Sequence, residues 1–271
     1  MIKFLWRKIL KPFLNIFLKS NCPLCQRPTD REFCKYCERQ VWQCQFPHGG
    51  QTFPGKIPVF IWGEYKDSLK RAIAAMKYQD NPQIARPLGH WLGDGWLNSA
   101  LCKRQVGTTT LDKIVVVPIP MHKKKLKERG FNQAELLAKS FCELTGLQLR
   151  RNGLERVKQT QALFGLSSGE RLETVKDAFT VGKDFRRSRP RSLVLLVDDI
   201  YTTGATVNSA IKVLQKAGIK VVGVLAIATT RKPSVSLKSK VKSQKSKVRS
   251  DINRNLQKRG NREHETWNSE E

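Results

Sequence analysis

The order of apolar and polar positions predicts an α/β body between two flanking segments of different character. Short apolar runs, typical of strands buried on both faces, alternate with stretches whose apolar residues recur at helical spacing. We predict a strand and two helices between 59 and 97, and a short strand over 178–181. The remaining elements are strands over 113–119, 193–197 and 221–228, with helices over 133–144 and 204–217. This alternation favours a parallel sheet flanked by helices.

The two flanks differ from this body. Residues 1–20 are apolar at near-helical spacing but interrupted by basic residues. They predict a helix that either packs on the body or lies on an anionic membrane surface, and not a signal peptide or a membrane span. Residues 231–271 are rich in Ser, Lys and Arg and predict a disordered basic tail. We therefore expect a helix over 1–20, a cysteine-rich module over 21–50, an α/β domain over 51–230 and the tail.

Charge and cysteine content narrow the class of protein. Among 271 residues, 50 Lys and Arg face 23 Asp and Glu, for a formal charge of +27. Such an excess favours anionic partners, nucleic acid among them. Seven cysteines in a chain long enough to bury a core indicate a reducing, cytoplasmic compartment. We expect the basic run His122–Arg129 to form a loop that is either solvated surface or a contact for a polyanion such as single-stranded DNA.

Four cysteines have the spacing of a metal site. Cys22 and Cys25 form one C-x-x-C pair, and Cys34 and Cys37 form a second. Two such pairs suit a tetrahedral zinc ion, because a two-residue gap lets both sulfurs of a pair face one ion. A closed site of four thiolates leaves no open coordination position, so we expect zinc to be structural.

An acidic pair next to a hydroxyl-rich turn is the most informative segment. The apolar run 193–197 is followed by Asp198 and Asp199, and then by Thr202, Thr203, Gly204, Ala205 and Thr206 at the start of a helix. Backbone N–H groups and hydroxyls of such a turn can hold a phosphate, and Gly204 permits a positive φ. Carboxylates at the carboxyl end of a strand are placed to accept hydrogen bonds from sugar hydroxyls, directly or through Mg²⁺.

Residues 195–206 resemble the phosphoribosyl-pyrophosphate (PRPP) motif of type I phosphoribosyltransferases. The resemblance implies that Asp198 and Asp199 hold the ribose, with Mg²⁺ accompanying PRPP. It implies that the turn from Thr202 to Thr206 holds the 5′-phosphate. In that fold the segment after the first sheet strand binds pyrophosphate, which makes Lys124, Lys127 and Arg129 candidate ligands.

The wider chain is similar to the ComF competence-protein family. The resemblance lies in the two cysteine pairs and the acidic pair, together with the segments 117–120, 129–133 and 160–161 and with Arg171. One position departs from the family's pattern, since Thr174 stands where the family usually has Asn. The resemblance implies a cytoplasmic role in DNA uptake during natural transformation, and it leaves a position close to the membrane open. The partners it implies are single-stranded DNA and a competence helicase or other uptake proteins.

Two alternatives stay open. One is an active phosphoribosyltransferase, a glycosyltransferase of nucleoside metabolism, that uses PRPP and Mg²⁺ with an unknown acceptor. The other is a regulator that senses PRPP. Glutamine-dependent transfer is not expected, since no cysteine precedes Cys22 and no glutaminase domain fits.

Overall fold

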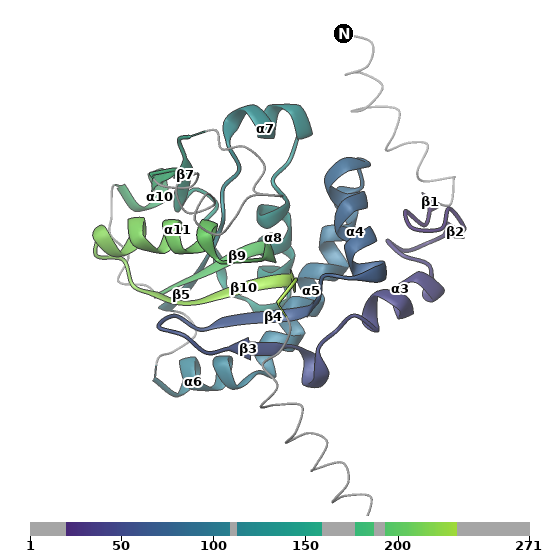
Figure 1. Cartoon of the computed structure of the whole chain (residues 1–271), viewed down its shortest axis with the longest axis horizontal. Coiled ribbons are helices and arrows are strands. Elements are labelled where there is room, and N and C mark those ends of the chain that lie inside the picture. The colour runs from purple at the N-terminus through teal and green to yellow at the C-terminus, as the bar shows by residue number, and fades with distance from the viewer. Residues whose placement is uncertain (1–19, 109–112, 159–176, 187–192, 232–271) are drawn as a thin grey trace, which may run out of the picture. The chain divides into compact units, whose positions relative to one another are not determined.

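The computed structural model describes residues 20–108, 113–158, 177–186 and 193–231 (Figure 1). The chain divides into two units, Met1–Thr230 and Arg231–Glu271, and the described elements belong to the first. The predicted helix over 1–20 and the predicted tail lie outside these residues, apart from Ser20 and Arg231. So does the segment 159–176 with the motif residues Thr160, Gln161, Arg171 and Thr174.

A six-stranded sheet forms the centre of the first unit, in the order β3-β4-β10-β9-β5-β6. Only β3 and β4 pair antiparallel; all other neighbours in this sheet are parallel. The strands are β3 (Gln51–Phe53), β4 (Val59–Glu64), β5 (Ile114–Pro118), β6 (Gln148–Leu149), β9 (Leu193–Tyr201) and β10 (Val221–Thr229). Two small antiparallel pairs join β1 (Ser20–Asn21) to β2 (Pro28–Thr29) and β7 (Leu154–Arg156) to β8 (Phe179–Val181). The predicted α/β class with a mainly parallel sheet is confirmed.

Helices cover both faces of the sheet (Figure 1). Apolar residues of α4 (Asp67–Tyr78), α5 (Ala85–Leu97) and α8 (Gln133–Thr145) form one core cluster with the sheet. Those of α11 (Ala205–Lys216) form a second cluster together with β7 and β8. The remaining helical segments are α3 (Lys35–Trp42), η2 (Pro47–Gly49), η3 (Pro82–Ile84), α6 (Ala100–Thr108), α7 (Lys123–Arg129) and α10 (Lys183–Arg186). Within the described ranges, no helix is both long and apolar enough to cross a bilayer.

The central strand β9 shows why an unbroken apolar run indicates burial on both faces. Val194 and Leu196 belong to the cluster with α11, whereas Leu195 and Val197 belong to the cluster with α4, α5 and α8. Side chains of a strand alternate between the two faces of a sheet. Continued one step further, this alternation sends Asp198 and Asp199 to opposite faces.

Two local expectations differ from the structure. The basic segment, expected as a loop, is the helix α7, because His122 accepts a hydrogen bond from the Lys124 backbone N–H at 3.3 Å and Gly130 (φ +87°) ends the helix. Lys, Leu, Glu and Arg are also good helix formers. The strand β9 runs on to Tyr201, so the acidic pair lies within the strand and not after it.

The helices α5 and α8 approach each other closely at Gly89. A Cβ added at Gly89 would lie 2.6 Å from the Ser140 Cβ and 2.7 Å from the Leu137 carbonyl oxygen, both rigid parts of α8. At Gly93, one turn later, an added Cβ would meet chiefly the end of the Leu144 side chain, which is flexible and partly exposed. Only the first position therefore needs glycine for packing.

We expect Gly89→Ala to lower the free energy of unfolding by about 1 to 3 kcal/mol, because the added methyl group overpacks the α5–α8 contact. The matched variant Gly93→Ala should be neutral or more stable by up to about 1 kcal/mol, since alanine is the better helix former. Urea unfolding of both variants measures the difference. Equal effects at the two positions would contradict this account of the packing.

Candidate functional site

The four predicted metal-ligating cysteines come together. The sulfur atoms of Cys22, Cys25, Cys34 and Cys37 all lie within 4.8 Å of one another. Tetrahedral zinc with Zn–S bonds of about 2.3 Å needs sulfur atoms about 3.8 Å apart. The cluster can therefore hold a metal ion of this size with small side-chain adjustments.

Local backbone structure presents these sulfurs to one point. Cys34 is the N-cap of α3, where its Sγ accepts the Cys37 backbone N–H at 3.5 Å, so the second pair lies at a helix N-terminus. That end of a helix favours thiolate over thiol. Burial raises the pKa of the Cys22 thiol, but backbone hydrogen bonds at Cys34, Leu24 and Cys25 outweigh it and bring that pKa to about 7. The surroundings thus favour the deprotonated ligand that a metal requires.

The cysteine cluster is part of the main hydrophobic core. Cys22, Phe33 and Cys37 belong to the same buried cluster as α4, α5 and α8. The Arg71 guanidinium of α4 donates to the Leu24 carbonyl oxygen at 2.6 Å, and Phe33 stacks on Trp91 with ring centroids 6.2 Å apart. Folding of the cysteine segment is therefore coupled to the packing of α4 and α5.

The acidic pair is surrounded by cations from both faces of the sheet. On the side of α4, Lys77 Nζ lies 2.6 Å from the Asp199 carboxylate, and both side chains are about five-sixths buried. Asp198 Oδ1 accepts the Asp199 backbone N–H at 2.8 Å, and the charge of Arg156 on β7 also acts on Asp198. The two carboxylates diverge as strand alternation requires.

Burial and mutual repulsion control the ionisation of this site. Burial first, and Asp199 second, raise the pKa of Asp198 to about 7, although Lys77 and Arg156 oppose them. Burial would lower the pKa of Lys77, but Asp199 and then Asp198 outweigh it and raise that pKa. Near neutral pH, Asp198 can therefore exchange a proton while Lys77 stays charged.

The predicted phosphate turn connects β9 to α11. Gly204 has a φ of +84°, and an added Cβ would lie 2.6 Å from the Tyr201 hydroxyl oxygen, so both conformation and space require glycine there. Thr203 Oγ1 accepts the Ala205 backbone N–H at 3.4 Å. Thr202 and Thr206 are half-buried, while Gly204 and Ala205 are buried. The turn has the expected form at a helix N-terminus, and its role in phosphate binding stays a prediction.

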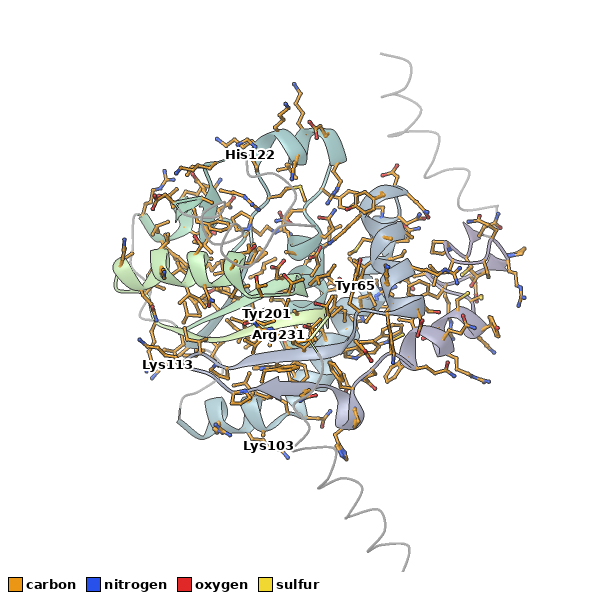
Figure 2. The ribbon with its side chains drawn as sticks, viewed as in Figure 1. Tyr65, Lys103, Lys113, His122, Tyr201 and Arg231 are labelled. Carbon is orange, nitrogen blue, oxygen red and sulfur yellow. The ribbon has the colours of Figure 1, made fainter. Side chains whose placement is uncertain are left out.

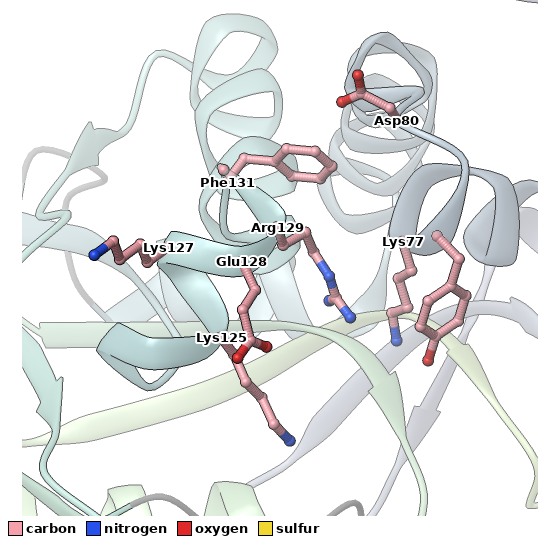
Figure 3. A pocket seen from close by; sticks show the side chains of 9 residues that line it. Lys77, Asp80, Lys125, Lys127, Glu128, Arg129 and Phe131 are labelled. Atoms are coloured by element: carbon pink, nitrogen blue, oxygen red, sulfur yellow. The ribbon is translucent and has the colours of Figure 1, made fainter.

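A cationic cavity of about 590 Å³ lies between the end of α4 and α7 (Figure 3). It is lined by Lys77, Tyr78, Asp80, Lys125, Lys127, Glu128, Arg129, Gly130 and Phe131. Of the three predicted pyrophosphate ligands, Lys127 and Arg129 line this cavity, whereas Lys124 lies in the first turn of α7 and is not among the lining residues. Lys77 joins this cavity to the acidic pair, since it lines the one and contacts the other.

The chain is similar in sequence to proteins named for competence and DNA utilization. No family model matches the chain. It is 29% identical to competence protein F of Haemophilus influenzae over 79% of this chain and 93% of that protein. It is 26% identical to DNA utilization protein YhgH of Escherichia coli K12, over 77% and 90%, and to competence protein ComFC of Bacillus subtilis, over 73% and 72%. The chain is a homologue of competence protein F.

Adenine phosphoribosyltransferases are among the solved structures that align with the chain. Adenine phosphoribosyltransferase of Trypanosoma brucei, in complex with AMP, pyrophosphate and ribose-5-phosphate, is 11% identical with a TM-score of 0.34, over 71% of this chain and 79% of that one. The enzyme of Leishmania donovani is 10% identical with a TM-score of 0.33, over the same shares.

Sequence reasoning missed three residues of this region. Lys77 and Tyr78 end a helix far from the acidic pair in the sequence, and Arg156 follows a turn. The sequence around these three residues does not distinguish them from ordinary side chains exposed to solvent. Four described tryptophans are part of the packing. Trp62 and Trp96 are fully buried, Trp91 stacks on Trp62, and Trp42 meets Trp62 edge-on.

We expect Asp198→Asn to stabilise the protein in a pH-dependent way. The native pKa of about 7 exceeds the unfolded value of about 3.9, so ionisation costs native stability progressively between pH 4 and 7. Asparagine keeps an oxygen for the Asp199 N–H and removes the charge. Its free energy of unfolding should exceed that of the natural protein by on the order of 1 to 3 kcal/mol at pH 8, with little difference at pH 4. Urea unfolding of both proteins at pH 4 and pH 8 measures this difference. A difference in the free energy of unfolding that is the same at both pH values would contradict the raised pKa of Asp198.

Removal of the metal ion should unfold the cysteine segment and disturb the aromatic cluster. We expect one bound divalent ion per chain, and a loss of near-ultraviolet circular dichroism from the Phe33–Trp91 contact after chelation. Cys37→Ser should reproduce this loss, whereas Cys142→Ser, whose thiol lies outside the cluster, should retain the ion. Full metal content in Cys37→Ser would contradict the ligand set.

Proposed function

We propose that this protein binds single-stranded DNA in the cytoplasm during DNA uptake, with the cationic cavity beside the acidic pair as part of the binding surface. The observation that carries the proposal is homology to proteins named for competence and DNA utilization, over most of both chains. The formal charge of +27 supports it, because DNA binding draws on neutralisation of phosphates.

The charge near the cavity has the right sign for phosphate. Lys125, Lys127 and Arg129 come from α7, and Lys77 comes from α4. Burial, then the charges of Arg156 and Arg129, lower the pKa of Lys125. A phosphate beside Lys125 would offset this repulsion among cations, which favours an anionic ligand at this place.

The proposal includes a structural zinc ion on the four cysteines. The four-thiolate donor set and the helix N-terminus at Cys34 support zinc over hard cations such as Mg²⁺, which prefer oxygen ligands. When bound, zinc would fix the turn at Cys22 to the start of α3. It would take no part in DNA chemistry, since all four positions are filled by the chain.

PRPP binding is a second candidate function, and one observation favours it. Asp198 and Asp199 diverge near the carboxyl end of β9, which runs on to Tyr201. The turn that follows has Gly204 in the left-handed conformation and leads into α11. In this candidate Asp198 and Asp199 hold the ribose, directly or with Mg²⁺, and Thr202, Thr203, Ala205 and Thr206 surround the phosphate. Lys77 would then have to leave Asp199 or share it with the ligand.

The primary test is binding of a fluorescent oligothymidine strand by the full chain between 50 and 300 mM salt. We expect the logarithm of the affinity to fall linearly with the logarithm of salt, by about 0.7 for each phosphate contacted. Lys127→Gln should weaken binding and reduce this slope, whereas Lys139→Gln, an exposed lysine on α8 outside the cavity, should not. Absence of salt-sensitive binding would overturn the proposal.

The same titration separates the second candidate. PRPP with millimolar Mg²⁺ should displace the strand if the turn after β9 and the DNA surface overlap. PRPP binding that Asp199→Ala abolishes, in a protein that binds no DNA, would support the transferase or the PRPP sensor instead.

A further inference from the structure

An exposed aromatic ring stands at the rim of the cationic cavity. Tyr78, the last residue of α4, is 76% exposed, the highest value among the large apolar or aromatic side chains of the described ranges. The Arg129 guanidinium, at the end of α7, lies over this ring with its central carbon 5.3 Å from the ring centroid. Figure 3 shows Arg129 and Lys77 extending toward each other from the two walls of the cavity.

This pair is not needed for the core. At 76% exposure Tyr78 buries little apolar surface, and Arg129 approaches it from another helix. A cation above one face of an exposed ring holds the ring in place and leaves the remaining surface open for a ligand. Aromatic rings and guanidinium planes presented in this way are the usual stacking partners of unpaired bases.

The cavity supplies what a base with its phosphate would need. Its volume of about 590 Å³ lies in the range typical of ligand sites, about 300 to 1,000 Å³. Phe131 lines the same wall as Arg129, and the side chains of Lys125 and Lys127 come from the preceding turn of α7. Aromatic and cationic groups therefore meet within one cavity.

We propose that Tyr78 and Arg129 form a stacking site for one base of a single-stranded DNA, whose adjacent phosphate lies on Lys125 and Lys127. The inference rests on the proposed function. It adds the position at which one base of the bound strand is buried against the protein. Single strands are favoured over duplexes because bases in a duplex are already stacked on each other. Stacking of this kind tolerates any base, so little sequence preference is expected.

The test compares an oligothymidine strand with a strand of equal length in which the bases are removed and the sugar-phosphate chain is kept. The natural protein should bind the strand with bases about 5- to 150-fold more tightly, which is the stacking contribution of one base. Tyr78→Ala should lose that difference and leave the salt slope unchanged, and Tyr78→Trp should keep it. Because Tyr78 is so exposed, the variants should keep the thermal stability of the natural protein.

Tyr36 provides a matched control. It is 56% exposed and lies under the Arg27 guanidinium at 5.4 Å, but on α3 beside the cysteine cluster. Tyr36→Ala should bind both strands as the natural protein does. If only Tyr36→Ala lost the preference for bases, the site would lie on the cysteine segment and the proposal would be overturned.

The remaining outcomes separate this inference from the proposed function. Salt-dependent binding of both strands with equal affinity would overturn the stacking site and leave DNA binding intact. No binding of either strand would overturn both. Binding of a free thymidine monophosphate as tightly as the strand would overturn the assignment to DNA in favour of a mononucleotide.

Discussion

The ion pair between Lys77 and Asp199 offsets the repulsion between two neighbouring carboxylates at the end of β9. Two partly buried negative charges this close cost several kcal/mol unless cations lie near them. Lys77 on α4 pairs with Asp199 on one face of the sheet, and the charge of Arg156 on β7 acts on Asp198 from the other face. The arrangement of α4 and β7 around β9 is therefore tied to the charge of the acidic pair.

The position of α4 in turn depends on the cysteine segment. Arg71, six residues before Lys77 on the same helix, donates to the Leu24 carbonyl oxygen between the first two cysteines. Phe33 stacks on Trp91 of α5, in the core that also holds α4. A metal ion on the cysteines would thus stabilise the helix that supplies both Lys77 and Tyr78. This gives the segment a structural role at the proposed DNA surface without contact with DNA.

Local signals in the sequence predicted the main strands and helices of the sheet and the two chemical motifs. They did not predict the short strands β1, β2, β3, β6 and β7 or the helices α3, α6, α7 and α10. Apolar runs predicted β5, β9 and β10 because a parallel strand is covered on both faces, whatever the details of its neighbours. Helical spacing over 133–144 predicted α8, and the Asn132 side chain caps its start by accepting the Ala134 N–H at 3.2 Å. The basic run forms the helix α7 instead of the predicted loop, because Lys, Leu, Glu and Arg are good helix formers and His122 caps the helix.

The sequence by itself determined the α/β class, the four clustered cysteines and the acidic pair before the Gly204 turn, because each depends on residues close together in the chain. Only the tertiary structure decided that Lys77 neutralises Asp199 and that Tyr78 meets Arg129. The first contact joins α4 to β9 and the second joins α4 to α7, and all three elements are distant from one another in sequence. The residues next to a lysine or tyrosine at a helix end do not indicate which distant residue it will contact, because that contact depends on how the elements pack.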